Sequence, residues 1–265
     1  MTYSNYEGMN MEGSVLRLER SSIFDGDGYR TVIFLKGCPL RCQWCSTPES
    51  HHLQIETTPD GSITYGRIMT VEEIMKEVRK DIPFYFHSGG GMTVSGGEIL
   101  VQPDFVRTLL KRACWEGIDT AIETTMFGSW DIIEPILDVT CTAFVDLKFI
   151  NSQKHKQYTG VSNERILENI KKAGTMKNGY KLIIRTPLIP GINDSEEELD
   201  ANGRFLEELP NVDHLQFLPY HRLGTDTYRK LGIPYQLSHL RSPSEEHMEW
   251  CRSIAGKYLP VNSHQ

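Results

Sequence analysis

The feature that most constrains the fold is a repeated alternation of short apolar runs with amphipathic helical patterns. The apolar runs are typical of buried strands and cover residues 31–35, 92–95, 120–124, 143–148, 181–187 and 214–218. Helical spacing of apolar residues covers 70–81, 104–116, 132–137, 163–176 and 195–209. Such strand–helix units favour a parallel sheet with right-handed crossovers. The pattern therefore predicts an α/β fold, an incomplete (β/α)6 barrel.

Length and charge limit the other possibilities. A chain of 265 residues can bury a sizeable core and can form one α/β barrel. No repeat, low-complexity segment or linker divides it, so we expect one domain over residues 1–265, with residues 1–12 frayed. The net charge is −7 and the basic residues are scattered, which argues against non-specific binding to nucleic acid. No apolar run is long enough to span a membrane.

Three cysteines follow the first apolar run, and their spacing is C-x3-C-x2-C. They are Cys38, Cys42 and Cys45. Thiolates hold iron–sulfur clusters, and a cubane cluster normally takes four of them. Because the next cysteine, Cys114, lies far away in a helical pattern, the loop offers three ligands and leaves one iron open. A zinc site completed by the histidine pair at 51–52 stays open as an alternative, since Cys/His tracts bind zinc.

The other cysteines indicate the cellular compartment in which the protein works. Cys114, Cys141 and Cys251 are isolated in the sequence, and no disulfide framework is visible. We therefore expect the reducing cytoplasm.

The loop sequence GCPLRCQWCSTPES, residues 37–50, resembles the cluster loop of the radical S-adenosylmethionine (SAM) enzymes. It is similar to that of the glycyl radical enzyme activating enzymes, such as pyruvate formate-lyase activating enzyme. The resemblance implies one 4Fe–4S cluster on Cys38, Cys42 and Cys45, with the open iron binding the amino and carboxylate groups of SAM. It also implies that Trp44 packs beside the cluster and that Ser46 contacts the cofactor.

A glycine-flanked strand ends at Gly96, Gly97 and Glu98. Glycines at a strand end let a ligand approach the backbone closely. A Gly-Gly-Glu by itself is weak evidence, and a tight turn would be the default interpretation. One strand after a cluster loop, it resembles the family motif that binds the amino group of SAM.

Polar side chains recur where the later strands end, the edge at which chemistry collects in β/α barrels. They are Glu123, Thr124, Asp146, Lys148, Arg185 and His221. Any one of them alone is better explained as a solvated strand end or a structural ion pair. The resemblance implies that the last four contact SAM. It also implies a monovalent cation site at Glu123, Thr124 and Asp146, where Glu123 replaces the usual aspartate.

The resemblance implies an oxidoreductase that cleaves SAM reductively and abstracts hydrogen from a backbone glycine of a partner glycyl radical enzyme. Flavodoxin or ferredoxin is the expected electron donor, and the enzyme is expected to be a monomer. No cysteine lies between Cys45 and Cys114, which predicts the absence of the ferredoxin-like insert found in larger relatives. Two alternatives remain: a radical SAM enzyme acting on a small molecule, and a zinc-stabilised binding module without catalysis.

Two features bear on the partner enzyme. The stretch CSTPES, residues 45–50, resembles activators of glycyl radical dehydratases, decarboxylases and C–N lyases. In lacking the insert, the chain resembles the compact activating enzymes of the pyruvate formate-lyase type. We expect a lyase or dehydratase as the target, with pyruvate formate-lyase as the next candidate.

The spacing generates a direct test of the cluster ligands. Changing Cys38, Cys42 or Cys45 to alanine should abolish SAM cleavage, because each thiolate holds one iron. The same change at Cys114, Cys141 or Cys251 should leave the iron content intact. Iron and sulfide analysis of anaerobically purified protein measures both, and two clusters per chain would contradict the prediction.

Overall fold

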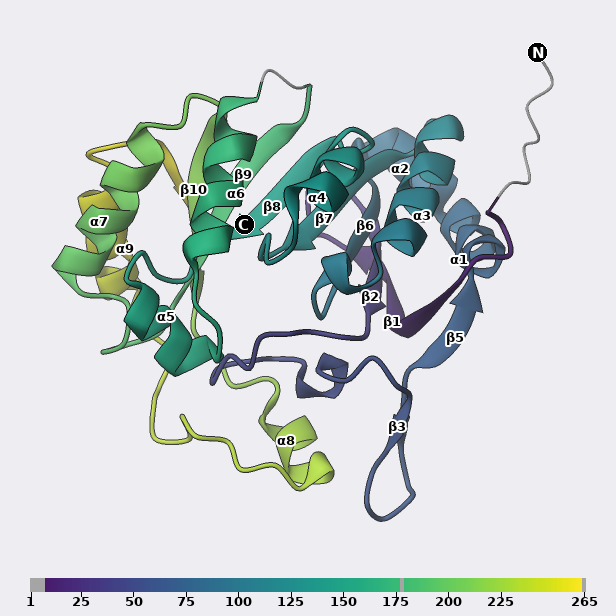
Figure 1. Cartoon of the computed structure of the whole chain (residues 1–265), viewed down its shortest axis with the longest axis horizontal. Helices are drawn as coiled ribbons and strands as arrows, with labels where there is room; N and C mark the ends of the chain where they lie inside the picture. The colour runs from purple at the N-terminus through teal and green to yellow at the C-terminus, as the bar shows by residue number, and fades with distance from the viewer. Residues whose placement is uncertain (1–7, 177–178, 264–265) are drawn as a thin grey trace. The chain divides into compact units, whose positions relative to one another are not determined.

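The computed structural model describes residues 8–176 and 179–263, which form two compact units (Figure 1). The N-terminal unit comprises residues 1–38, 49–123 and 129–142, and the C-terminal unit comprises 39–48, 124–128 and 143–265. The single domain expected from the sequence stays a prediction. Of the segment expected to fray, residues 1–7 lie outside the described part of the chain.

Parallel strands form the centre of the N-terminal unit. β2 (Arg30–Leu35) pairs in parallel with β6 (Gly91–Gly96), and β6 pairs in parallel with β7 (Asp119–Thr124). β1 (Glu12–Ser22) adds to β2 in the antiparallel sense, and β5 (Arg67–Thr70) adds to β1 in the same way. β3 (Glu56–Thr57) and β4 (Thr64–Tyr65) form a small antiparallel hairpin.

The helices of this unit begin and end at recognisable residues. α1 (Val71–Val78) starts with a capping box, in which the backbone N–H groups of Glu73 and Thr70 each donate to the other residue's side chain. It ends earlier than the predicted 70–81, because the 3-10 turn η2 (Arg79–Asp81) follows. α2 (Ile82–Ser88), α3 (Pro103–Trp115) and α4 (Trp130–Leu137) complete the set, with the short 3-10 helices η1 (Pro48–Ser50) and η3 (Ile99–Val101).

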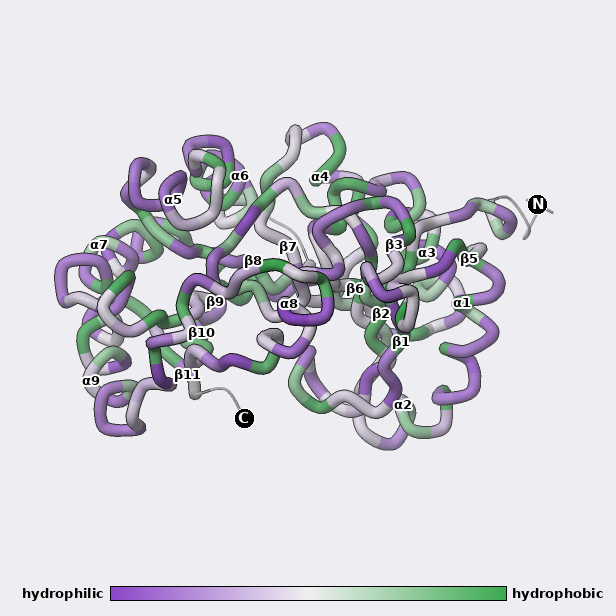
Figure 2. Tube along the Cα trace, turned by 90° about the horizontal axis from the view of Figure 1, so that it is seen from below, coloured by the Kyte–Doolittle hydropathy of each residue, from purple (hydrophilic) through white to green (hydrophobic). Residues whose placement is uncertain are grey.

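The C-terminal unit repeats the arrangement. β9 (Lys181–Leu188) pairs in parallel with β10 (Val212–Pro219), and β10 pairs in parallel with β11 (Val261–Ser263). β8 (Thr142–Asp146) neighbours β9. The helices are α5 (Ser152–Thr159), α6 (Glu164–Thr175), α7 (Glu196–Glu207), α8 (Thr225–Leu231) and α9 (Glu245–Ala255). Figure 2 draws most of α5 in the hydrophilic colour.

The six predicted strands correspond to β2, β6, β7, β8, β9 and β10, and the predicted α/β class with mostly parallel strands is confirmed. Sequence reasoning missed α2, α5, α8, the β3–β4 hairpin, β5 and β11. α5 is mostly polar, so its sequence lacks the apolar periodicity that indicates a helix. The signals that do mark it are the cap residue Asn151, whose side chain accepts from the Lys154 N–H at 3.0 Å, and the left-handed Gly160 at its end. Within the described residues, no helix has both the length and the apolar character to cross a membrane.

Candidate active site

The cysteine loop leaves β2 and is fixed by backbone hydrogen bonds rather than by regular structure. At its start, the N–H of Gly37 donates to the Ser50 carbonyl at 2.7 Å. Further along, the N–H of Arg41 donates to the Thr159 carbonyl at 2.7 Å. The N–H of Cys45 donates to the Cys42 carbonyl at 3.0 Å, which makes a tight turn between two thiols. All three loop thiols are half-buried.

Trp44 anchors the later part of this loop in the apolar core of the C-terminal unit. It packs in a buried cluster with Phe149, Ile189, Tyr220 and Leu237. Its ring centroid lies 6.2 Å from that of Phe149. Truncating a buried aromatic of this size costs about 3–5 kcal/mol. Trp44 therefore holds Cys42 and Cys45 in a fixed place on the C-terminal unit.

Two predicted site residues, Lys148 and Asp146, lie near Cys42. Burial raises the pKa of the Cys42 thiol to about 12, and the positive charge of Lys148 opposes this shift only in part. Lys148 is buried, and its Nζ donates to Asp146 Oδ2 at 2.5 Å. A metal cation reverses such a shift, because a coordinating thiol is deprotonated outright. Iron bound at Cys42 would therefore hold its sulfur as a thiolate, and the positive charge of Lys148 favours that anion.

The predicted glycine motif packs on the start of the cysteine loop. The N–H of Gly97 donates to the Leu35 carbonyl at 3.0 Å, and the N–H of Glu98 donates to the Gly37 carbonyl at 2.8 Å. A Cβ on Gly97 would lie 2.2 Å from the Gly37 oxygen, so only glycine fits here. Glu98 is buried and accepts from the Leu100 N–H at 3.1 Å, which gives it a structural task.

The two residues at the end of β7 have separate local partners. Ser95 Oγ donates to Glu123 Oε2 at 2.5 Å. Thr124 Oγ1 accepts from the N–H of Met126 at 2.9 Å, and Met126 has a φ of 57°. The Thr124 hydroxyl thus stabilises an unusual left-handed residue in the turn that follows.

Arg185, expected at a strand end, lies inside β9, three residues before its last residue, and His221 lies two residues after the end of β10. Arg185 is buried; its Nε donates to Gln216 Oε1 at 2.8 Å, and its guanidinium lies 3.6 Å from the Phe144 ring centroid. His221 is exposed overall, yet partial desolvation of its ring lowers its pKa. The imidazole is therefore neutral near pH 7 and can accept a hydrogen bond.

Sequence reasoning missed two buried polar residues beside these positions. Lys36, directly before the cysteine loop, is fully buried, and its Nζ donates to the Glu49 carbonyl at 2.5 Å. Gln216 orients Arg185. The available signal was a polar residue inside an apolar run, since Lys36 ends IFLK and Gln216 interrupts HLQFL.

The zinc alternative finds no support. Within residues 8–176 and 179–263, no three His, Cys, Asp or Glu side chains converge as ligands of one metal ion. A zinc knuckle needs that convergence. In a cubane each thiolate binds a different iron, so three half-buried thiols on one loop fit a cluster better.

Comparison with known proteins identifies the family. The model of the Radical SAM superfamily matches residues 32–201. The chain belongs to the radical SAM superfamily. Within it, the relatives are glycyl radical enzyme activating enzymes. The isethionate sulfite-lyase activating enzyme of Oleidesulfovibrio alaskensis is 38% identical over 85% of this chain and 89% of its own length. The pyruvate formate-lyase-activating enzyme of Clostridium pasteurianum is 32% identical over 88% and 93%.

A solved domain of the Bacteroides vulgatus pyruvate formate-lyase-activating enzyme is 30% identical and covers 67% of this chain and 100% of that chain, with a TM-score of 0.56. Streptococcus suis SuiB bound to its precursor peptide is 18% identical, with a TM-score of 0.60 over 88% of this chain and 47% of that chain, and shares the fold alone. The radical SAM fold expected from the resemblance is confirmed.

The two relatives differ in how many additional residues their alignments with this chain contain. The alignment with the isethionate lyase activator spans 276 positions although it uses 85% of this 265-residue chain, so that relative carries additional residues with no counterpart here. The alignment with the Clostridium pasteurianum protein spans 234 positions and uses 88%, which leaves almost no such residues. This radical SAM chain combines the compact length of the latter with a higher identity to the former.

The buried His155, which packs against Phe149 of the Trp44 cluster, leads to a prediction of how stability depends on pH. His155 is buried against Phe149, and desolvation, aided by the charge of Lys148, lowers its pKa below the usual value of about 6.5. The unfolded chain takes up the proton first, so this contribution to stability is present above that pH and is lost as the pH falls. We expect the melting temperature to drop between about pH 6.5 and 5, and to drop less in His155→Gln.

The exposed His239 supplies the control. His239→Gln should melt with the same pH dependence as the unchanged chain. An equal slope in His155→Gln and the unchanged chain would contradict the assignment.

Proposed function

We propose that this radical SAM enzyme activates a glycyl radical enzyme by abstracting hydrogen from a backbone glycine of that partner. The observation that carries the proposal is the 38% identity to an isethionate sulfite-lyase activating enzyme over nearly its whole length, together with the three-cysteine loop. When bound, a 4Fe–4S cluster supplies the electron for reductive cleavage of SAM. Cys38, Cys42 and Cys45 would hold it.

The chain's other residues have the task of binding and orienting SAM. The Lys148 ammonium is a charge partner for a carboxylate, and Asp146 is an acceptor for an amino or hydroxyl group. The close backbone at Gly96 and Gly97 offers main-chain groups to the ligand, and Arg185 is held rigidly by Gln216. Rigid supports matter because small displacements of a reacting group reduce rates steeply.

A monovalent cation would be held by Glu123, Thr124 and Asp146. Their oxygens are the hard ligands that such ions prefer, although Ser95 and Met126 already use part of the capacity of Glu123 and Thr124. SAM affinity measured with and without potassium tests this site.

The electron donor we propose is an acidic carrier, flavodoxin or ferredoxin. The segment 221–242 holds four Arg or Lys residues and one Asp, whereas the whole chain has 28 basic and 35 acidic residues. It lies against the cysteine loop, because a Cβ on Gly224 would meet the Cys45 carbonyl oxygen at 3.0 Å. Leu223 is 81% exposed at its surface. Charge complementarity of this kind steers short-lived redox encounters.

We further propose that the enzyme works as a monomer in the reducing cytoplasm. Three half-buried loop thiols would bind iron there without competing oxidation.

SAM binding tests the pocket residues. Lys148→Ala and His221→Ala should each weaken SAM binding by about one to two decades, because a hydrogen bond to a charged group contributes roughly 1.5–3 kcal/mol. Iron content should not change. Equilibrium binding to the cluster-loaded protein measures this, and unchanged affinity in both variants would place the pocket elsewhere.

The donor surface is tested by charge reversal. The double variant Arg222→Glu, Arg241→Glu should raise the donor dissociation constant roughly tenfold at low salt, while SAM cleavage driven by dithionite stays intact. The matched control is Arg204→Glu on α7, whose side chain is 71% exposed. An equal loss with dithionite would show that the variant damages the enzyme rather than donor docking.

The partner enzyme is tested by electron paramagnetic resonance. The higher identity to isethionate and sulfopropanediol activators favours a lyase or dehydratase target, with pyruvate formate-lyase next. Anaerobic mixtures with reductant, SAM and each candidate should give a glycyl doublet with the lyase or dehydratase. A doublet with pyruvate formate-lyase alone would overturn that choice, and 5′-deoxyadenosine release independent of every protein partner would favour a small-molecule substrate.

A further inference from the structure

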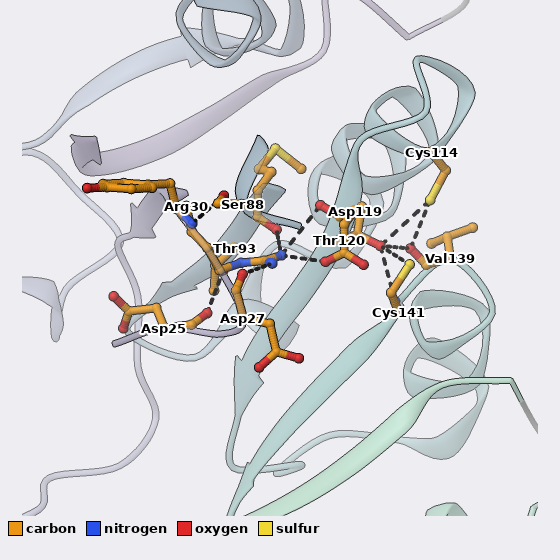
Figure 3. A network of polar contacts seen from close by, with 12 residues as sticks. Asp25, Asp27, Arg30, Ser88, Thr93, Cys114, Asp119, Thr120, Val139 and Cys141 are labelled. Atoms are coloured by element: carbon orange, nitrogen blue, oxygen red, sulfur yellow. Dashed lines mark hydrogen bonds and ion pairs between the residues drawn. The ribbon is translucent and has the colours of Figure 1, made fainter. Parts of the chain in front are cut away.

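Two cysteines outside the predicted cluster loop face one hydroxyl group in the N-terminal unit (Figure 3). Thr120 Oγ1 lies 3.7 Å from Cys114 Sγ and 3.6 Å from Cys141 Sγ. The Cys114 thiol also donates to the Val139 carbonyl at 3.3 Å. The distance between the two sulfurs therefore cannot exceed the sum of their distances to the Thr120 hydroxyl oxygen. Figure 3 shows both side chains pointing toward the same spot.

Both residues are exposed, so reagents in solution can reach them. Cys114 comes from the last turn of α3, and Cys141 from the loop after α4. Hydrogen bonds of Thr120 hold the two cysteines together. The Thr120 hydroxyl donates to the Val139 carbonyl at 2.9 Å, and the N–H of Cys141 donates to the backbone carbonyl of Thr120 at 2.9 Å. Residues far apart in sequence thus form one dithiol.

The frame around the dithiol is rigid. Asp119, beside Thr120, pairs with the fully buried Arg30 at 2.9 Å. Arg30 also donates to the Thr93 hydroxyl at 2.7 Å and the Met92 carbonyl at 2.9 Å, which ties the start of β7 to β6. A frame of this kind lowers the entropic cost of joining two side chains.

We propose that Cys114 and Cys141 are a site of reversible disulfide formation by exchange with small disulfides such as oxidised glutathione. One thiolate attacks the small disulfide and releases one small thiol. The second thiolate then attacks the mixed disulfide, forms the Cys114–Cys141 bond and releases the other small thiol. Two protein thiols are oxidised, and one small disulfide is reduced to two thiols.

The site is separate from Glu123, a residue proposed for the monovalent cation. Thr120 lies at the beginning of β7, and Glu123 lies near its other end. The internal bond would keep two exposed thiols from cross-linking different chains without changing the cysteine loop.

Mass spectrometry of the full chain tests the proposal. Burial raises the pKa of Cys114, so the reaction with oxidised glutathione is run in alkaline buffer. The tryptic peptide 113–148 contains both cysteines and should lose two hydrogens, with no added glutathione. Cleavage after glutamate at positions 116, 123 and 134 should leave two peptides joined by the disulfide, and dithiothreitol should separate them.

Three variants sharpen the result. Cys114→Ser and Cys141→Ser should each carry one glutathione on the remaining thiol, whereas Cys251→Ser should still form the internal bond. Stable glutathione adducts on both thiols of the unchanged chain, disulfide-linked dimers through them, or no reaction would overturn the proposal. The outcome is independent of SAM cleavage and of the partner enzyme.

Discussion

The arrangement of this radical SAM enzyme depends on how a loop without regular structure is held in place. Its backbone donors are paired with distant carbonyls, Gly37 with Ser50 and Arg41 with Thr159. An unpaired buried donor costs about 1–3 kcal/mol, so each pairing restricts where the loop can lie. The Gly37 carbonyl in turn accepts from the N–H of Glu98. Gly97 makes this hydrogen bond possible, because any side chain at position 97 would collide with the Gly37 oxygen.

Both units contain buried cations, and each of these has a partner close by. Lys36 binds the Glu49 carbonyl, Lys148 binds Asp146, and Arg185 binds Gln216 over an aromatic face. A buried charge is tolerated only with such partners. Of the three, Lys148 acts on the Cys42 thiol, and its positive charge favours a thiolate there.

Compact length and lyase-type similarity occur together in this chain. Relatives that activate isethionate sulfite-lyase carry additional residues, whereas this chain aligns with the Clostridium pasteurianum protein almost without them. The additional residues are therefore not a requirement of the shared radical SAM fold. The loop sequence therefore bears on the cluster chemistry, whereas the alignment length bears on how many residues a relative adds to the shared fold.

The sequence by itself determined the parallel α/β architecture, because strand and helix periodicities are local properties that a single chain displays. It also determined the cysteine loop, since Cys38, Cys42 and Cys45 lie within eight residues. It missed α5, whose polar surface hides its period, and the partners of buried groups. Only tertiary structure decided that Gln216 supports Arg185, that Lys36 holds the Glu49 carbonyl, and that Cys114 and Cys141 share one hydroxyl. These contacts join residues far apart in the sequence, and chain folding alone sets which of them meet.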